Sequence, residues 1–402
     1  MKKNVFKLKT KQLMEIALSL QNKVLKGLEK ENTEVQCIPT FIYPKTGDVD
    51  GKALVLDLGG TNYRAAVVEF NDGKPTIRPE NGWKKDLSVM KTPGFTLEKL
   101  LSEQGDLISE ISRDEKMPIG YCFSYPAAST DDGDANLLRW TKGVDIKEMI
   151  GKPVGKPLMD YLNGHHNDRF TGIKVVNDTV ASLFAGLADS DYDAWIGLIV
   201  GTGTNMATFI NPEKIKKLKD IPEGRKLMPV NLESGNFRPP YLTTVDDNVD
   251  ANSDNKGAQR FEKAVSGMYL GDILKSVFPC DEFETNFDAR KLTHIMNYPD
   301  IHKKKYVKVA HRIYVRSAQL VAASLAGLIL VIVSHDKSVK RIRLTAEGSL
   351  FWSEHKKGID YNKLVSKKLH KLLKKFGHSD VEVHIAQPDN ANLIGSAIAA
   401  LS

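Results

Sequence analysis

The sequence predicts an α/β fold in which two lobes enclose a cleft. Strand-forming stretches alternate with helix-forming stretches along the chain, which is the pattern of α/β proteins. An apolar strand also runs into a glycine turn twice, at residues 54–60 and again at residues 195–203. Two such hairpins, one in each half of the chain, suggest a duplicated βββαβα core that grips phosphates from both sides. With 402 residues, the chain is long enough to bury a large core.

The first glycine turn joins two predicted strands. An apolar run containing Asp57 ends at Gly59, Gly60 and Thr61, and strand-forming residues then resume. Glycines let the backbone approach a ligand closely, and successive N–H groups can cradle phosphate oxygens. Asp57 is placed to hold Mg²⁺, directly or through water. Taken alone, these residues fit equally well an ordinary hairpin with Asp57 and Thr61 acting as caps.

Hydrophobic periodicity predicts the other elements in order. Helices are expected at residues 10–30, 96–112, 258–279 and 306–333, with a small-residue helix through 395–397. Strands are expected at residues 119–123, 173–176, 195–200, 207–210, 340–345 and 381–385, with a polar turn at 130–136.

The charge of the chain has a structural explanation. Two lysine-rich stretches, 214–219 and 367–375, interleave leucine or isoleucine with lysine, as the solvent side of an amphipathic helix does. The net charge of +7 is therefore attributed to solvated helix faces, and no nucleic-acid partner is expected. The apolar run at 320–333 is shorter than the ~20 residues that span a bilayer, so we expect a buried helix.

Cysteine usage and the start of the chain bear on its location. Cys37, Cys122 and Cys280 lie far apart and form no CxxC pair, so neither a disulfide framework nor a zinc site is indicated. The basic start is not followed by an apolar signal core. We therefore expect a cytoplasmic protein with no membrane partner.

Acidic and amide side chains recur at the ends of predicted strands, at Asp57, Asn177, Asp178 and Asn205. Ligands of open α/β sheets gather outside the carboxyl ends of the strands. Glu233 and Glu262 complete a set that can accept and donate hydrogen bonds to vicinal sugar hydroxyls. Taken singly, Asn177 and Asp178 could instead cap the following helix, and Glu262 could be a surface acid.

Together these segments resemble the hexokinase family of the actin/hexokinase/Hsp70 superfamily, in its eukaryotic-type group rather than the shorter bacterial glucokinases. In order and spacing, the matching motifs cover nearly the whole chain. They are LDLGGTN at 56–62, FSYP at 123–126, WTKG at 140–143, VNDTV at 176–180, GLIVGTGTN at 197–205, NLESG at 231–235, FEK at 261–263 and SGMYLG at 266–271.

The resemblance implies a two-lobed, actin-like (ribonuclease H-like) fold with a central cleft. The small lobe would comprise residues 48–176 plus 387–402, and the large lobe residues 1–47 plus 177–386. It implies a hexokinase that uses ATP and Mg²⁺ to phosphorylate a hexose at the 6-hydroxyl, giving hexose 6-phosphate and ADP, the first step of glycolysis. Glucose is the first candidate, with mannose or fructose next. A catalytically weak sugar sensor and a kinase for another sugar, such as an amino sugar, are the alternatives. Monomer and homodimer both stay open.

The resemblance also implies roles for individual residues. Asp178 would be the catalytic base that deprotonates the 6-hydroxyl, and Asp57 would hold the Mg²⁺. The hexose would contact Ser124, Thr141, Lys142, Asn177, Asp178, Asn205, Glu233 and Glu262. The phosphates and nucleoside would lie near Asp57, Gly59, Gly60, Thr61, Asn62, Arg64, Gly201, Thr202, Gly203, Gly348 and Ser349.

Two departures from the family pattern are apparent. Ser234 stands where many relatives carry Trp, which bears on the shape of the sugar pocket. Residues 386–392 lack the glycine-rich run of many relatives, so the resemblance leaves the exact adenine contacts near residues 386–396 open.

Overall fold

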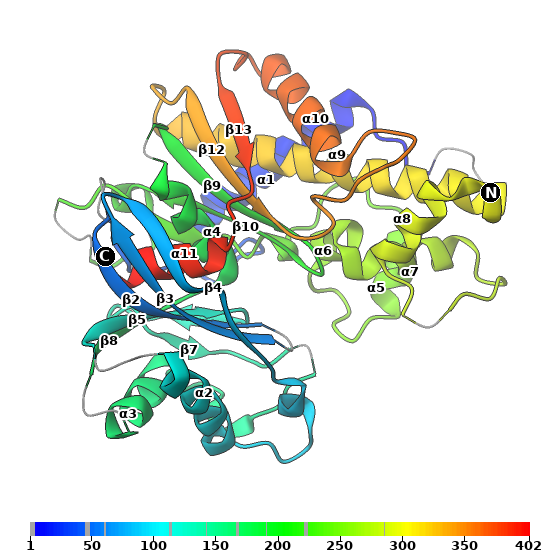
Figure 1. Cartoon of the computed structure of the whole chain (residues 1–402). Helices are drawn as coiled ribbons and strands as arrows, with labels where there is room; N and C mark the ends of the chain where they lie inside the picture. Colours follow the sequence, from blue (N-terminus) through cyan, green and yellow to red (C-terminus); the bar gives the residue numbers. More distant parts are fainter. Residues whose placement is uncertain are drawn as a thin grey trace.

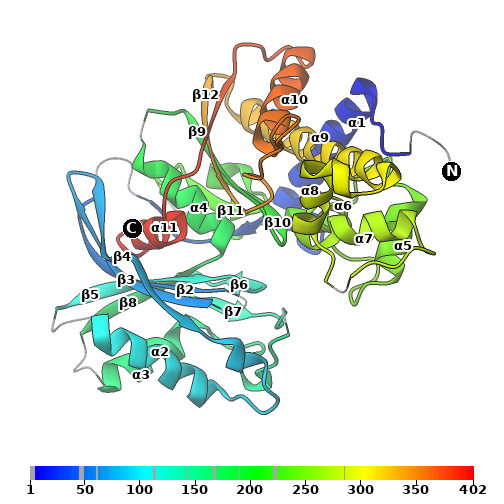
Figure 2. The same ribbon diagram turned by 45° about the vertical axis from the view of Figure 1, so that its right-hand side comes forward.

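The computed structural model describes residues 5–44, 49–59, 62–111, 115–141, 143–165, 169–189, 191–220, 224–284 and 286–402. Two lobes are visible, each organised around its own β-sheet (Figures 1 and 2). One sheet has the strand order β4-β3-β2-β5-β8, and the other has the order β1-β11-β10-β9-β12-β13.

The five-stranded sheet begins with an antiparallel meander, and its last two strands run parallel to β2. Its strands are β2 (Gly51–Leu58), β3 (Asn62–Asn71), β4 (Lys74–Asp86), β5 (Met117–Phe123) and β8 (Phe170–Val176). Leu54 and Leu56 of β2 face a core formed with helices α2 (Leu97–Ile111) and α3 (Gly155–His165). Ala53 and Val55 face the opposite core. Because both faces are covered, β2 reads as a continuous apolar run.

The second sheet repeats this arrangement. Its meander is followed by two strands that run parallel to β9. Its strands are β9 (Ala194–Val200), β10 (Thr204–Ile210), β11 (Met228–Asn231), β12 (Arg341–Glu347) and β13 (Glu382–Ala386), with the short β1 (Ile38–Pro39) at the edge beside β11. In both sheets the first strand of the meander lies in the middle, so the predicted duplicated core is confirmed.

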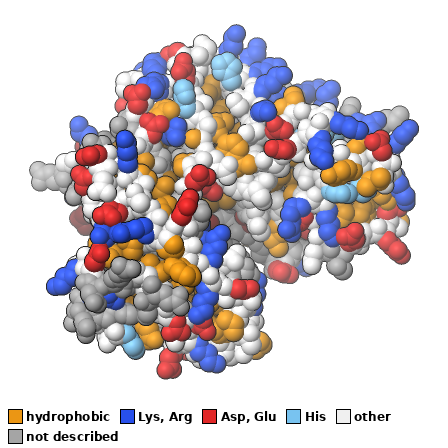
Figure 3. All heavy atoms as spheres, viewed as in Figure 1, with side chains coloured by type: hydrophobic (Ala, Val, Ile, Leu, Met, Phe, Trp, Pro, Cys, Tyr) orange, Lys and Arg blue, Asp and Glu red, His pale blue; other side chains and the backbone are white. Residues whose placement is uncertain are grey.

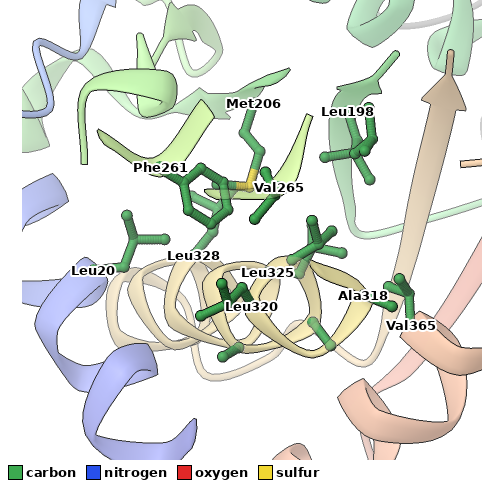
Figure 4. Close-up of a cluster of buried hydrophobic side chains, with 14 of the residues drawn as sticks. Leu20, Leu198, Met206, Phe261, Val265, Ala318, Leu320, Leu325, Leu328 and Val365 are labelled. Atoms are coloured by element: carbon green, nitrogen blue, oxygen red, sulfur yellow. The ribbon is translucent and has the colours of Figure 1, made fainter. Parts of the chain in front are cut away.

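The large lobe is built on helix α9 (Lys304–His335), which packs against α1 (Thr10–Glu29) and α10 (Tyr361–Lys375). Leu325 and Leu328 of α9 point into the apolar cluster of this lobe (Figure 4). By length and composition α9 is the one helix among the described residues that could cross a membrane, but 89% of its apolar window is buried inside the protein. The run at 320–333 is therefore the buried helix that was expected.

A third apolar cluster joins the two lobes. It contains α4 (Asp178–Ala185), α11 (Ala391–Ala400), the inner face of β2 and β3, and Ala207 and Phe209 of β10. The ribbon views show α4 and α11 between the two sheets (Figures 1 and 2). The remaining helices are α5 (Thr244–Ala251), α6 (Arg260–Val265), α7 (Gly267–Val277) and α8 (Ala289–Asn297).

One predicted helix is wrong, because residues 258–279 form two helices, α6 and α7. Ser266 between them is extended, with φ −82° and ψ 158°. The break turns the next two amides outward, so Gly267 N–H donates to the carbonyl of Gly201 at 2.6 Å and Met268 N–H donates to that of Thr202 at 3.3 Å. In an unbroken helix these amides would donate to carbonyl groups four residues earlier in the same helix.

The two lysine-rich stretches have different outcomes. Residues 367–375 lie in α10, and lysine and arginine side chains gather over it at the top of Figure 3. Residues 214–219 are wrongly predicted as an amphipathic helix, since only a 3₁₀ turn at Pro212–Lys214 forms there. The Lys217 side chain is 3% exposed, and its Nζ donates to the carbonyl of Gln36 at 2.7 Å. That lysine ties two loops together instead of facing solvent.

The polar turn at 130–136 is the end of a small hairpin. Strand β6 (Ala127–Ser129) precedes the predicted turn, the last two residues of that turn belong to β7 (Ala135–Leu137), and the two strands pair antiparallel. Periodicity could not show strands of three residues.

Candidate active site

The carboxyl ends of three parallel strands bring predicted site residues to one edge of the five-stranded sheet. In the strand register, Asp57 of β2 lies beside Cys122 of β5. Cys122 in turn lies beside Val176 of β8. Ser124 and Asn177 each follow one of these residues closely, so both lie at the same edge as Asp57. Ser124 N–H donates to the carbonyl of Leu58 at 3.2 Å.

Asp57 is paired with an arginine at this edge. Nε and Nη2 of Arg64 approach Oδ2 of Asp57 at 3.0 and 2.5 Å. Nη1 of Arg64 lies 3.3 Å from Oδ1 of Asn390. Asn390 is in the left-handed region, with φ 55°, immediately before α11. Arg64 thus links the first glycine hairpin to the C-terminal segment.

The first glycine turn is tied to the tyrosine that follows Ser124. The carbonyl of Gly59 accepts a hydrogen bond from Tyr125 Oη at 2.8 Å. Gly59 N–H donates to the carbonyl of Asn62 at 2.9 Å, and Asn62 is exposed. Gly60 and Thr61 lie outside the described residues.

The second glycine turn lies against the turn that follows β12. Gly348 has φ +109°, and a Cβ there would stand 2.4 Å from the carbonyl of Val200. Only glycine fits at such an approach. Gly201 is buried in this contact, whereas Thr202 and Ser349 are exposed. This edge of the second sheet therefore presents backbone groups and two hydroxyls to solvent.

Glu262 reaches the second glycine turn from α6. Its Oε2 accepts the N–H of Thr204 at 3.0 Å. A Cβ at Gly203 would stand 2.6 Å from the same oxygen, so glycine is needed there for the carboxylate to approach. The predicted phosphate turn and this predicted sugar ligand are immediate neighbours.

A chain of amide hydrogen bonds connects two further predicted sugar ligands. Nδ2 of Asn205 donates to Oδ1 of Asn231 at 2.7 Å, and Nδ2 of Asn231 donates to Oε1 of Glu233 at 2.8 Å. Oδ1 of Asn205 accepts N–H groups from Met206 at 2.8 Å and Ser234 at 3.0 Å. Asn231 had no role in the sequence prediction. Its position at the head of the NLESG motif was the available signal.

Glu233 occupies an unusual environment. Its backbone is left-handed, with φ 52°. Burial raises the pKa of its carboxyl, the charge of Asp178 adds to the rise, and the hydrogen bond from Asn231 and the charge of Arg139 oppose it. Glu233 therefore keeps its proton to a higher pH than an ordinary glutamate.

A cavity collects residues from both lobes. Of the predicted sugar ligands, its lining contains Asn177 and Glu233, and it also includes Ile38, Thr40, Tyr125 and Asn231. The space-filling view shows an indentation where the two lobes meet (Figure 3). Ser124, Asn205 and Glu262 lie on neighbouring elements but do not line this cavity.

Asn177 and Asp178 stand at the junction of β8 and α4. Thr179 N–H is shared by Oδ1 of Asn177 at 3.0 Å and Oδ1 of Asp178 at 2.8 Å. Asn177 is the N-cap of α4, so the capping interpretation is correct as far as the backbone is concerned. Asp178 directly follows Asn177, which lines the cavity, and the charge of Asp178 adds to the raised pKa of Glu233.

Thr141 lies in the loop that follows β7. This loop is anchored by Trp140, whose ring centroid is 4.8 Å from that of Tyr125 and 5.9 Å from that of Phe123. Thr141 directly follows this anchor, and Ser124 lies between the two aromatic residues that the anchor contacts. Lys142 lies outside the described residues.

Glu347 is a further acid at this site that sequence reasoning missed. It ends β12, directly before Gly348. Burial raises the pKa of Glu347 to about 7; the charge of Arg64 opposes the rise, and those of Asp57, Asp178 and Asp389 add to it. An acid at the end of a strand, followed by glycine, was the signal that could have revealed it.

Comparison with known proteins gives consistent matches along the chain. Family models described as hexokinase match residues 2–187, 195–280 and 280–402. The chain is 32% identical to Hexokinase-1 of Bos taurus over 285 residues, which is 68% of this chain and 31% of that protein. It is 33% identical to Hexokinase-1 of Rattus norvegicus over the same length, again 31% of that protein. The chain therefore spans under a third of the length of these curated relatives.

Solved structures resemble most or nearly all of the chain. A hexokinase from Schistosoma mansoni complexed with glucose has a TM-score of 0.80 and 25% identity, over 99% of this chain and 96% of that one. A ROK hexokinase from Thermus thermophilus has a TM-score of 0.55 at 17% identity, over 87% of this chain and 98% of that one. The second likeness bears on the fold alone.

Proposed function

The chain belongs to the hexokinase family, and on that premise we propose that it transfers the γ-phosphoryl group of ATP to the 6-hydroxyl of a hexose. The products are hexose 6-phosphate and ADP, as in the first step of glycolysis. The observation that carries the proposal is the cavity that Asn177 and Glu233 share, with Asp178 beside it and the Asp57–Arg64 pair at the same sheet edge.

The sugar-binding part of the proposal is supported by the chemistry of the side chains. Asn205, Asn231 and Glu233 form a connected set of amides and a carboxylate whose orientations are fixed by hydrogen bonds. Such groups accept from and donate to neighbouring hydroxyls of one ring. Glucose is the first candidate, and mannose or fructose are the next.

In the proposed reaction Asp178 removes the proton from the 6-hydroxyl as the oxygen attacks in line. A positioned carboxylate contributes about 10²–10⁴-fold as a general base. Charge that develops on the transferred group is met by N–H groups of the glycine turns and by the Thr202 hydroxyl. Arg64 lies close enough to Asp57 to add a fixed positive charge there.

The residues at Asp57 fit a magnesium ion carried by the nucleotide. No cluster of three or more potential ligands among His, Cys, Asp and Glu occurs within the described part of the chain, so a dedicated protein cage is not indicated. Mg²⁺ typically keeps several waters and binds one or two carboxylates plus substrate phosphates. Arg64 engages only Oδ2 of Asp57. When bound, the ion would be held by Asp57, directly or through water, and would neutralise charge on the phosphates.

We further propose that the lobes divide at residues 48–176 plus 387–402 for the small lobe, with the remainder in the large lobe. A cytoplasmic location stays part of the proposal. The division is supported by the sheet composition, since all strands of the five-stranded sheet fall between Gly51 and Val176.

An ADP-release assay across hexoses tests the function. Purified protein with MgATP should release ADP with glucose, and to some extent with mannose or fructose. Activity with an amino sugar alone would favour the kinase for another sugar. Tight glucose binding without ADP release would favour the sugar sensor and reject the proposed reaction.

A further inference from the structure

A cluster of buried charges lies behind the helical turn that carries Glu262. Lys263 has a side chain only 2% exposed, and its Nζ donates to Oδ1 of Asp250 at 2.6 Å and to the carbonyl of Asn255 at 2.8 Å. Arg260 has a side chain 10% exposed and donates through Nη1 to Oδ2 of Asp250 at 3.3 Å. These two cations flank Glu262 on α6, and both converge on one carboxylate.

Asp250 connects more than these two side chains. It lies in the last turn of α5, is 8% exposed, and accepts the N–H of Gly257 on both oxygens at 3.0 Å. Although burial favours its neutral form, the hydrogen bonds from Lys263 and Gly257 and the charges of Lys263 and Arg260 hold the pKa of Asp250 below its usual value. The loop between α5 and α6 and the helix α6 itself are thus fastened to one ionised group.

Helix α5 is in turn fixed to the core of the large lobe. Asp246 in its first turn accepts from Nη2 and Nη1 of Arg316 at 2.6 and 2.8 Å, and both side chains are almost completely buried. Asp246 also accepts the N–H of Thr243 at 2.7 Å. Arg316 belongs to α9, so the connection runs from the central helix through α5 to α6.

Helix α6 depends on tertiary contacts because it is short, and the ties to Asp250 add to the burial of Phe261 and Val265 in the core. It has six residues, whereas isolated helices below about 12–15 residues are marginal in water. It also starts from a left-handed residue, Gln259, with φ 49°. Its own hydrogen bonds therefore cannot fix the place of Glu262 relative to Thr204 and Gly203.

We propose that Asp250 is a positioning residue for Glu262. By holding Arg260 and Lys263 it fixes α6 against the second glycine turn, so that the Glu262 carboxylate faces the hexose. This inference rests on the proposed function, in which Glu262 binds the sugar. Loss of the tie should weaken the binding of the hexose more than that of ATP, because Glu262 is assigned to the hexose, whereas Asp57 and Arg64 of the phosphate site belong to the other sheet.

The test compares Asp250→Asn with the matched control Asp247→Asn. Asp247 also contacts Arg260, but its side chain is 62% exposed. Asp250→Asn should raise the KM for the hexose by about tenfold to a hundredfold, by analogy with the loss found when the outer-shell partner of a metal-binding side chain is removed. The KM for ATP should rise by a smaller factor, because the second glycine turn that α6 contacts is also assigned to the phosphates. Asp247→Asn should leave both KM values unchanged.

A second variant separates positioning from stability. Asp250→Asn leaves a buried ammonium without its anion, which by itself can unfold a protein. Asp250→Asn combined with Lys263→Met removes that charge together with its partner. This double variant should be folded by circular dichroism and should still show the raised hexose KM. A folded single or double variant with a wild-type hexose KM overturns the inference.

Failure of the inference can be told apart from failure of the proposed function. Wild-type protein and Glu262→Gln are measured in the same assay. A wild type that phosphorylates no hexose rejects the proposed function. If the wild type is active, Glu262→Gln has a raised hexose KM and the Asp250 variants have a wild-type hexose KM, then only the role of Asp250 is rejected.

Discussion

At the scale of single residues, Asp178 combines two tasks. Its Oδ1 accepts from Thr179 N–H at 2.8 Å at the start of α4, and in the proposed reaction its carboxylate takes a proton from the hexose. Asp178→Asn keeps the shape and one acceptor but cannot take a proton. We expect kcat to fall by about 10²-fold or more, with a much smaller change in hexose Kd. Asn caps helices as well as Asp does, so a residue that only caps predicts nearly full turnover in a folded variant. Turnover within about tenfold of wild type would count against the base.

Asp57 is the second residue with a distinct expectation. Asp57→Ala should impair phosphoryl transfer and leave hexose affinity close to wild type, because Asp57 is assigned to the metal and phosphates. Its removal also leaves Arg64, with a side chain 21% exposed, without its anion, so the melting temperature should fall. Glu69→Ala, which removes more exposed ion pairs with Arg78 and Lys52, is the control. An Asp57→Ala protein with normal turnover at ordinary Mg²⁺ would disprove the assignment.

Glu347 predicts a pH-dependent stability. Its folded-state pKa is raised from 4.5 to about 7, chiefly by burial. Stability from a raised carboxyl pKa is fully present below the unfolded value and is lost as the pH rises through the folded value. As the pH rises from 4.5 to about 7, the melting temperature of the wild type should therefore fall relative to that of Glu347→Gln. Glu354→Gln, at an exposed position, is the control. Parallel melting curves for wild type and Glu347→Gln would contradict the expectation.

At the scale of elements, the two close-packed glycines at the edge of the second sheet, Gly203 and Gly348, face different atoms: one a side chain, the other a backbone. Gly203→Ala places a methyl group against the mobile end of the Glu262 side chain. The carboxylate can move aside, so we expect a hexose KM raised by roughly tenfold or more, since small misplacements of a binding group are costly, with little change in melting temperature.

Gly348→Ala is the contrasting variant. It places a methyl group against the Val200 backbone at a residue with φ +109°, and left-handed strain of this kind costs about 1–3 kcal/mol. We expect a clear loss of melting temperature. Kinetics and melting curves are measured for Gly203→Ala and Gly348→Ala side by side. Equal losses of melting temperature in the two variants would disprove the distinction.

The elements also illustrate why α6 and α7 are separate. Local periodicity continues across Ser266, and the sequence pattern alone predicts one helix. The amides of Gly267 and Met268 bond to the second glycine turn, which lies more than 60 residues away in the chain. A tertiary contact therefore overrides the local preference.

At the scale of the whole molecule, the split site predicts closure. Asn177 follows a strand of the first sheet, and Glu233 follows a strand of the second, yet both line one cavity. A hexose that contacts both should draw the lobes together and exclude water from the γ-phosphate. Small-angle scattering should show a smaller radius of gyration at saturating glucose. An unchanged scattering profile in protein that binds glucose would contradict closure.

The sequence by itself determined the fold class and the family. Strand and helix periodicity, the two glycine turns and the order of short motifs are local patterns. Each can be recognised in the sequence without knowing which residues are neighbours in space. The sequence also predicts the duplicated sheets, the buried helix at 320–333 and the capping of α4 by Asn177.

Only the tertiary structure decided which side chains meet. Arg64 and Asn390 are 326 positions apart and lie 3.3 Å apart. Asn231 bridges two predicted sugar ligands, and Asp250 binds two cations of a neighbouring helix. Periodicity reports which face of an element is buried, but the partner of a buried polar group is set by how separate elements pack. Buried polar groups must be paired once they leave water. Their partners are therefore determined by the packing of separate elements and cannot be predicted from a local sequence pattern.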